Sequence, residues 1–146
     1  MVTASFFQIA FQLLLAVGLG AFIGFEREFK RKRAGLQTYA LVSLGACIFA
    51  IIAFQLVDYK LQTIDVSRII QAIAIGIGFI GGGVIFQRPS KIEGLTTAAG
   101  LWVAGSIGLA VGIKFYFLAV LATFFTISIL TGLGVIEEKF FKKKEI

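Results

Sequence analysis

The sequence has 146 residues, of which 58% are apolar and only 15% are charged. A soluble core of this size does not require so many long apolar runs, and the alternating segments of about ten residues that are typical of a membrane β-barrel are absent. The net charge of +6 comes from basic residues that flank the apolar runs, which argues against nucleic-acid binding. The composition therefore predicts an all-α, polytopic membrane protein.

Five apolar runs approach the ~20 residues that a helix needs to cross a bilayer. They predict transmembrane helices over residues 6–25, 36–57, 69–87, 95–113 and 115–136, and a basic cytoplasmic tail over residues 137–146. The boundary near Lys114 rests on length, because the apolar run from Leu95 to Ile136 is too long for one crossing at ~1.5 Å per residue.

A short segment occurs twice in the chain. Residues 35–40 (Gly-Leu-Gln-Thr-Tyr-Ala) are echoed by residues 94–99 (Gly-Leu-Thr-Thr-Ala-Ala), and each copy follows an apolar run and a short charged segment. The repeat predicts two helix pairs that run in the same sense, related by an axis along the membrane normal. Most of the 14 basic residues lie in the first and third connections and the tail, which predicts an external N-terminus and a cytoplasmic C-terminus.

Several kinds of chemistry are disfavoured by the residue inventory. Residues 1–5 carry no basic residue and no cleavage pattern follows, so we expect no cleavable signal peptide. The sequence has no histidine, and its single cysteine, Cys47, lies within the second predicted span. Because no nucleophile–base pair or metal-binding motif is present, we expect no enzymatic activity and no cofactor. The sequence names no set of metal ligands, so it leaves open whether the protein has a metal site.

Glu26, Arg27 and Glu28 lie at the cytoplasmic end of the first predicted span. A run of basic residues would be sufficient at a membrane edge, so the two carboxylates exceed what topology requires. Two interpretations remain open: a structural anchor at the headgroups, or a polar cluster that pairs with the other cytoplasmic turn or binds a divalent cation. We predict that Glu26 and Arg27 meet the turn around residues 88–97.

Two further polar groups are candidates. Asp65 or Ser67 is placed to cap the third helix, and Arg68 and Gln71 share a helix face at i, i+3 spacing. Thr97, preceded by Thr96, lies just inside the membrane, where its hydroxyl caps or bonds the backbone of a neighbouring helix. Each group has a structural interpretation beside the functional one.

Glycines at four-residue spacing predict close helix packing. Gly78 and Gly82 form a small-xxx-small face in the third predicted span, and Gly20 and Gly24 form a matching face in the first. We predict that the third span lies at the centre of the bundle. The alternative is a helix break in this glycine-rich run that exposes backbone carbonyls to an ion or a partner helix.

Four of these motifs, in this order, closely resemble the MgtC/SapB family of bacterial membrane proteins. They are residues 20–28 with 35–42, the Asp65-x-x-Arg68 pair, residues 76–85 and residues 94–103. The resemblance implies a multi-pass protein of the bacterial cytoplasmic (inner) membrane that is linked to growth under low magnesium. Well-known members also carry a cytoplasmic domain after the fifth helix, so we expect a short member that lacks this domain.

The resemblance also implies which residues and partners matter. It gives importance to a set of polar residues without assigning chemical roles: Glu26, Arg27, Glu28, Asp65, Arg68, Thr96 and Thr97. The best-known members are thought to restrain the proton-translocating ATP synthase, so such a membrane protein is an expected partner. The lipid bilayer and further copies of the chain in a homo-oligomer are the other expected partners.

Two function classes remain after these arguments. The first is a non-enzymatic regulator that acts on another membrane protein and is linked to magnesium limitation or membrane energetics. The second is a small oligomeric ion or solute channel or permease. The predicted spans hold no ionisable residue near their centres, which argues against a proton-coupled carrier but not against a pore lined by backbone groups.

Overall fold

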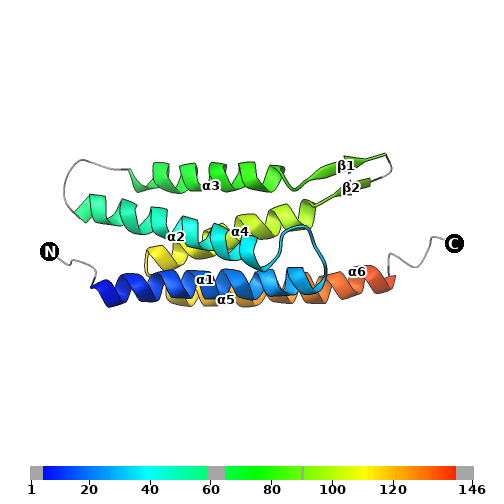
Figure 1. Ribbon diagram of the computed structural model, residues 1–146, viewed down its shortest axis with the longest axis horizontal. Coiled ribbons are helices and arrows are strands. Elements are labelled where there is room, and N and C mark those ends of the chain that lie inside the picture. Colours follow the sequence, from blue (N-terminus) through cyan, green and yellow to red (C-terminus); the bar gives the residue numbers. More distant parts are fainter. Residues whose placement is uncertain (1–4, 59–64, 90, 141–146) are drawn as a thin grey trace.

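The structure is a computed structural model that describes residues 5–58, 65–89 and 91–140 (Figure 1). Its elements, in chain order, are α1 (Phe6–Phe29), α2 (Leu36–Asp58), α3 (Val66–Gly82), β1 (Phe86–Arg88), β2 (Lys91–Glu93), α4 (Leu95–Gly112), α5 (Tyr116–Ser128), the π-helical turn η1 (Ile129–Leu133) and α6 (Gly134–Phe140). Among the described helices, α1, α2, α4 and the continuous stretch from α5 to Ile136 are long and apolar enough to cross a membrane. The predicted all-α, polytopic membrane architecture is thereby confirmed.

The third helix differs from its predicted span. It has 17 residues and ends at Gly82, whereas the sequence predicted a helix to residue 87. Glycines at its end lower helix propensity, and the following residues form an antiparallel hairpin in which Phe86 pairs with Glu93 and Arg88 with Lys91. This two-stranded sheet is the only one in the described part of the chain, and the sequence did not predict it.

The connections of the two helix pairs lie at the same end of the molecule. Figure 1 shows the α1–α2 turn, the β1–β2 hairpin and α6 at one end, and the start of α1, the end of α2 and the α4–α5 turn at the other. We call the first of these the basic end, because Arg27, Lys30 and Lys32 lie there. The common direction of both chain reversals agrees with a parallel repeat, although the superposition of the two pairs stays a prediction.

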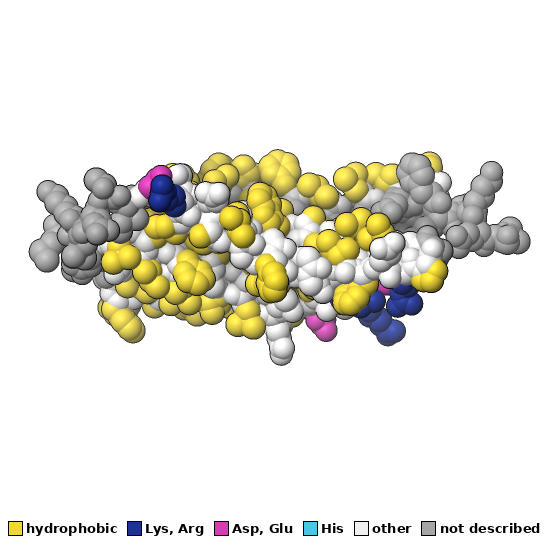
Figure 2. All heavy atoms as spheres, turned by 90° about the horizontal axis from the view of Figure 1, so that it is seen from above, with side chains coloured by type: hydrophobic (Ala, Val, Ile, Leu, Met, Phe, Trp, Pro, Cys, Tyr) yellow, Lys and Arg dark blue, Asp and Glu magenta, His cyan; other side chains and the backbone are white. Residues whose placement is uncertain are grey.

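Apolar side chains cover most of the described surface. Figure 2 shows one face on which only a few charged side chains interrupt the apolar ones. Large side chains such as Phe7, Phe79 and Phe117 are more than four-fifths exposed. In water such a surface would be unfavourable, but lipid is as apolar as these side chains, so the exposure fits a bilayer.

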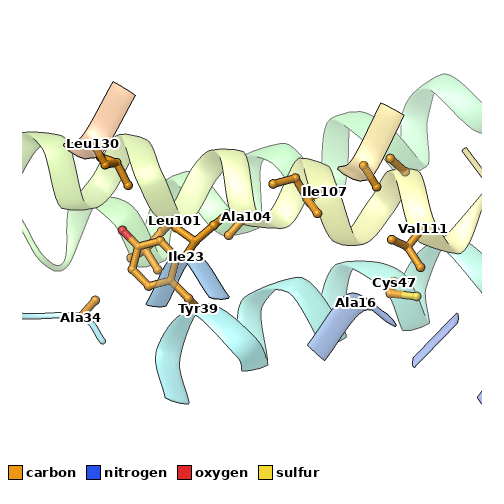
Figure 3. Close-up of a cluster of buried hydrophobic side chains, with 12 residues drawn as sticks. Ala16, Ile23, Ala34, Tyr39, Cys47, Leu101, Ala104, Ile107, Val111 and Leu130 are labelled. Carbon is orange, nitrogen blue, oxygen red and sulfur yellow. The ribbon is translucent and has the colours of Figure 1, made fainter. Parts of the chain in front are cut away.

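Helix α4 forms the centre of the bundle, because it contacts each of α1, α2, α3 and α5. Its buried residues Leu101, Ala104, Ile107 and Val111 form a core with Tyr39 of α2 (Figure 3). Small residues permit this approach. A Cβ atom at any of four α4 glycines would meet atoms of a neighbouring helix: Gly100, Gly105, Gly108 and Gly112.

Of the two glycine faces predicted from the sequence, one packs closely against another helix and the other does not. A Cβ atom at Gly20 would lie 2.6 Å from the Tyr39 carbonyl oxygen, and one at Gly24 would lie 2.7 Å from Leu36 Cα, so this face packs closely on α2 as predicted. The prediction was wrong for α3, which lies beside α4 and not at the centre. No neighbouring described atom lies within 4 Å of a Cβ at Gly78 or Gly82.

The physical reason for that error is helical phase. Ile77 and Gly81 are the buried positions of α3, one residue before the two glycines that the sequence singled out. Ile77 fills the space that the missing side chain of Gly105 leaves on α4, and Ala98 lies 3.5 Å from the Cβ position of Gly81. A large apolar residue thus supplies half of this contact, so a pattern of small residues alone could not locate it.

The orientation of the bundle can be tested with single cysteines. In a Cys47→Ala background, Ser67→Cys lies at the end opposite the basic end, and Gln87→Cys lies in β1; both positions are exposed. Positively charged loops remain in the cytoplasm, so we expect an impermeant maleimide to label residue 67 in intact cells and residue 87 only after permeabilisation. Labelling in the reverse pattern would show that the basic end faces outward.

Candidate functional site

The last turn of α1 carries a compact group of charges at the basic end. Arg27 is buried, with 3% of its side chain exposed, and its Nε atom lies 2.8 Å from a carboxylate oxygen of Glu26. Lys30 Nζ lies 2.8 Å from the other oxygen, one helical turn further on. These are ion pairs without hydrogen-bond geometry, because Arg27 Nε and Nη1 and both Glu26 oxygens have no hydrogen-bond partner among the described residues.

A cavity of about 520 Å³ adjoins this group. It lies between the end of α1, the start of α4 and η1, and its polar lining residues are Arg27, Lys30, Lys32, Thr96 and Thr97. Arg27 and the two threonines line the same cavity, which agrees with part of the prediction that Glu26 and Arg27 meet the turn around residues 88–97, but Glu26 does not line it. Arg88 and Lys91 of that turn pair with Glu93 and not with Glu26.

The N-terminus of α4 forms one wall of the cavity. Gly94 precedes the helix with φ of 95° and has no side chain that could cap the first N–H groups. Only glycine is suited to this position, since a Cβ would also meet the Val84 carbonyl oxygen. The Tyr39 hydroxyl of α2 donates a hydrogen bond of 3.2 Å to the carbonyl oxygen of Thr97, which connects α2 to the first turn of α4.

The π-helical turn η1 forms the opposite wall. Thr123, Thr126 and Thr131 each donate a hydroxyl hydrogen bond to the carbonyl oxygen four residues earlier, a pattern that bends helices. Lys30 Nζ donates a 2.8 Å hydrogen bond to the carbonyl oxygen of Leu130 within η1. The lysine thereby ties α1 to the fifth helix at the edge of the cavity.

A second charge cluster connects the α1–α2 turn to the hairpin. Glu93 is its centre, with carboxylate oxygens 3.0 Å from Lys91 Nζ and 3.4 Å from both Arg33 Nη2 and Arg88 Nε. The Arg33 guanidinium also lies over the Phe86 ring, 4.1 Å from its centroid. Sequence reasoning missed Glu93, and the concentration of basic residues around a lone carboxylate was the available signal.

The pKa of Glu93 is lowered from its ordinary value of 4.5 by hydrogen bonding to Lys91, and further by Arg88 and Arg33. A depressed native pKa means that the ionised cluster stabilises the hairpin above the ordinary value and that this contribution is lost as pH falls through the native pKa. We expect a spin label at Gln87→Cys to become more mobile on acidification below about pH 4.5. In Glu93→Gln the label is expected to be mobile at neutral pH as well; an unchanged spectrum would show that the cluster does not hold the hairpin.

Glu28 contacts the turn between α1 and α2. Its carboxylate accepts a 3.2 Å hydrogen bond from the backbone N–H of Leu36, so it caps α2 from the preceding helix. The exposed side chain lies against Gly35, where a Cβ atom would collide with it. Glu28 therefore holds the α1–α2 turn.

Asp65, Arg68 and Gln71 lie at the end opposite the cavity and are exposed, so they form no common site with Glu26. Of the two predicted caps of α3, Asp65 is the one that the structure shows, accepting a 2.9 Å hydrogen bond from the Ser67 N–H and a 2.6 Å bond from its hydroxyl. These two bonds lower the pKa of Asp65 below its ordinary value. Arg68 Nε lies 3.9 Å from the same carboxylate.

A groove separates α2 from α3. It has a volume of about 800 Å³ and an almost wholly apolar lining, in which small residues recur on both sides: Gly45 and Ala46 from α2, and Ala72 and Gly76 from α3. No neighbouring described atom lies within 4 Å of a Cβ at Gly45 or Gly76. The groove is thus an open helix-lined surface, with Arg68 among its lining residues.

A divalent-cation site at Glu26 has no support in the described residues, which contain no group of three acidic, cysteine or histidine side chains that could hold a metal ion. The neighbours of Glu26 are cations instead. The chemistry available around the cavity is that of hydrogen-bond donors and positive charge.

Comparison with known sequences gives consistent matches. A sequence model described as the MgtC family matches residues 13–139. The chain is 37% identical to SrpB of Synechococcus elongatus over 85% of its own length and 74% of that protein. It is 37% identical to YhiD of Escherichia coli K12, described as a proposed magnesium transporter, over 81% of this chain and 56% of YhiD.

A further relative is the protein MgtC of Brucella abortus strain 2308, which is 38% identical over 76% of this chain and 45% of MgtC. The chain thus spans about three-quarters of SrpB but only about half of YhiD and MgtC. No solved structure matches the chain.

Proposed function

The chain belongs to the MgtC family, and from that premise we propose that it is a non-enzymatic regulator that binds another integral membrane protein. The proposed process is adaptation to magnesium limitation or control of membrane energetics, in the bacterial inner membrane. The membrane sector of ATP synthase is the partner to test first. The observation that carries the proposal is the open groove between α2 and α3.

The groove has the properties of a docking surface for a transmembrane helix. In lipid, helices associate through close packing at small residues, because there is no water to expel from apolar side chains. Gly45 and Gly76 lie on opposite walls with free space above both Cβ positions. The occupant that we propose is a helix of the partner protein, whose backbone would approach these glycines closely.

The packing of α4 supports a regulator over a pore through one chain. The sides of α4 are filled by Tyr39, Ser43 and Ile77, which occupy the space next to Gly100, Gly108 and Gly105. A continuous channel along this central helix would need that space. A pore would therefore have to form between several copies of the chain.

The second candidate is such an oligomeric ion or solute channel. It is favoured by the description of the relative YhiD, which concerns magnesium transport. Ion flux in liposomes that contain only the purified protein separates the two candidates. Sustained Mg²⁺ or proton flux would support the channel, and liposomes as tight as protein-free ones would support the regulator.

The regulator is tested by filling the groove. Gly76→Leu is expected to reduce the protein's effect on ATP-driven proton pumping in inverted membrane vesicles by at least tenfold, and to abolish disulfide cross-linking between a cysteine at Ile73 and the ATP synthase membrane sector. Gly78→Leu is the matched control, because Gly78 is equally open but does not line the groove.

Equal activity of the Gly76→Leu and Gly78→Leu proteins would contradict the groove as the docking surface. Cross-linking from Ile73 only to a second copy of the chain would assign the groove to a homo-oligomer instead. If the wild-type protein has no effect on proton pumping, ATP synthase is excluded as the partner.

A further inference from the structure

We infer that the cavity at the basic end is a binding site for a phosphate group, from either a lipid headgroup or a soluble phosphate. This site lies apart from the α2–α3 groove, and the inference does not depend on the proposed function. Its main support is the buried Arg27, whose Nε and Nη1 atoms make no hydrogen bond with the described residues.

Arg27 contributes a buried guanidinium to the cavity wall. Its side chain is only 3% exposed, it lines the cavity, and its Nη1 atom has no hydrogen-bond partner among the described residues. A buried N–H donor without a hydrogen-bond partner is costly even where a carboxylate balances the charge, and such donors call for an explanation, of which a bound ligand is one. The guanidinium carries its donors in a planar fork that matches phosphate oxygens.

The charge around the cavity is positive after internal pairing. Glu26 lies next to both Arg27 and Lys30, which leaves one positive charge in this group of three. Lys32, an exposed lining residue, adds a second. A phosphate diester carries one negative charge, and a phosphate monoester carries about −1.5 to −2 at neutral pH, so either is compensated here.

The start of α4 supplies further donors. The N–H groups of its first turn have no side-chain cap, and Thr96 and Thr97 both line the cavity. The positive end of an 18-residue helix dipole adds to the attraction for an anion. The helix terminus and the buried arginine lie on the same cavity from different elements, which is the arrangement of a built anion site.

The apolar remainder of the lining comes from η1, where Ile129 and Leu133 border the cavity. A volume of about 520 Å³ exceeds what a single inorganic anion needs, so a phosphate ester fits with its substituent against these side chains. The end of α1 lies where the chain leaves the apolar layer, which is the depth of lipid phosphates.

The test uses the full chain in nanodiscs. In nanodiscs of digalactosyldiacylglycerol, a bilayer lipid without phosphate, inorganic phosphate is titrated against chloride at matched ionic strength, and Tm is measured. In a second arm, this lipid is replaced in part by phosphatidylglycerol, and retained lipid is measured by native mass spectrometry. A soluble-phosphate site predicts a saturable rise in Tm of about 5 °C in the first arm; a lipid site predicts selective retention of phosphatidylglycerol in the second.

Variants assign the effect to the cavity. We expect at least tenfold weaker binding in each of three variants: Arg27→Gln, Lys32→Gln and Thr96→Val. Because Lys32 and Thr96 are exposed, their variants are expected to fold and keep the test available if Arg27→Gln does not fold. Arg31→Gln is the control, because Arg31 is an exposed neighbour that does not line the cavity. No response in either arm, or an equal loss in Arg31→Gln and Lys32→Gln, would overturn the inference.

Discussion

Replacing Gly108 by alanine is expected to destabilise the protein more than any other single methyl group added to α4. The new Cβ atom would collide with the carbonyl oxygen of Ser43 on α2, and a backbone carbonyl cannot rotate away as a flexible side chain can. Overpacking of a dense core costs about 1–3 kcal/mol, and this contact is expected to reach or exceed the upper value. Thermal unfolding in detergent and the yield of monodisperse protein measure the effect.

Gly78→Ala is the matched control, since it adds the same methyl group to a helix glycine with free space around it. We expect its stability to equal that of the wild type or to exceed it slightly, because alanine favours helix more than glycine does. Gly82→Leu is likewise expected to fold normally, because no neighbouring described atom lies within 4 Å of a Cβ at Gly82. Equal losses in the Gly108 and Gly78 variants would show that α4 does not pack on α2 as described.

Glu26→Gln is expected to have the second large effect. The substitution removes the carboxylate that lies 2.8 Å from both Arg27 and Lys30 and leaves two neighbouring cations, one of them buried, without compensation. Removing one partner of a buried ion pair costs about 3–5 kcal/mol, and exposure of Lys30 places this case toward the lower value. A lower Tm at neutral pH is the expected measurement.

A double-mutant cycle separates charge from packing. Lys30→Met in the Glu26→Gln background removes one of the two unpaired cations, so it is expected to recover part of the lost stability. Arg88→Gln is the control, because Arg88 belongs to the separate Glu93 cluster. If Glu26→Gln has wild-type stability, the ion pairs of Glu26 contribute nothing, and its anchoring function must be abandoned.

The transmembrane character and most helix positions could be predicted from the sequence. Long apolar runs can satisfy their backbone groups in lipid only as helices, so four of the five predicted spans agree closely with α1, α2, α4 and the stretch from α5 to Ile136. The Gly20/Gly24 packing face and the Asp65 cap were also predictable. Both depend on spacing within one helix and on the residue type at its end.

Contacts between helices were decided by the tertiary structure alone. The spacing of small residues shows that a helix can pack closely, but it does not show which helix packs there. The sequence could therefore not distinguish Gly78 and Gly82, which have no close neighbour, from Gly105 and Gly108, against which other helices pack. The hairpin could not be predicted either, because a strand of three residues is too short to show the alternation of apolar and polar residues that identifies strands.

The candidate site illustrates the same division. The charge cluster at the end of the first span pointed to Glu26 and Arg27, and the repeated turn pointed to Thr97. Thr96 was singled out only by the resemblance to the family. Sequence reasoning could not give the burial of Arg27 or the cavity beside it, because these depend on how the end of α1 meets the start of α4 and the turn η1. Residue types and their spacing are local properties of the chain, whereas burial and unsatisfied donors arise only when distant segments pack together.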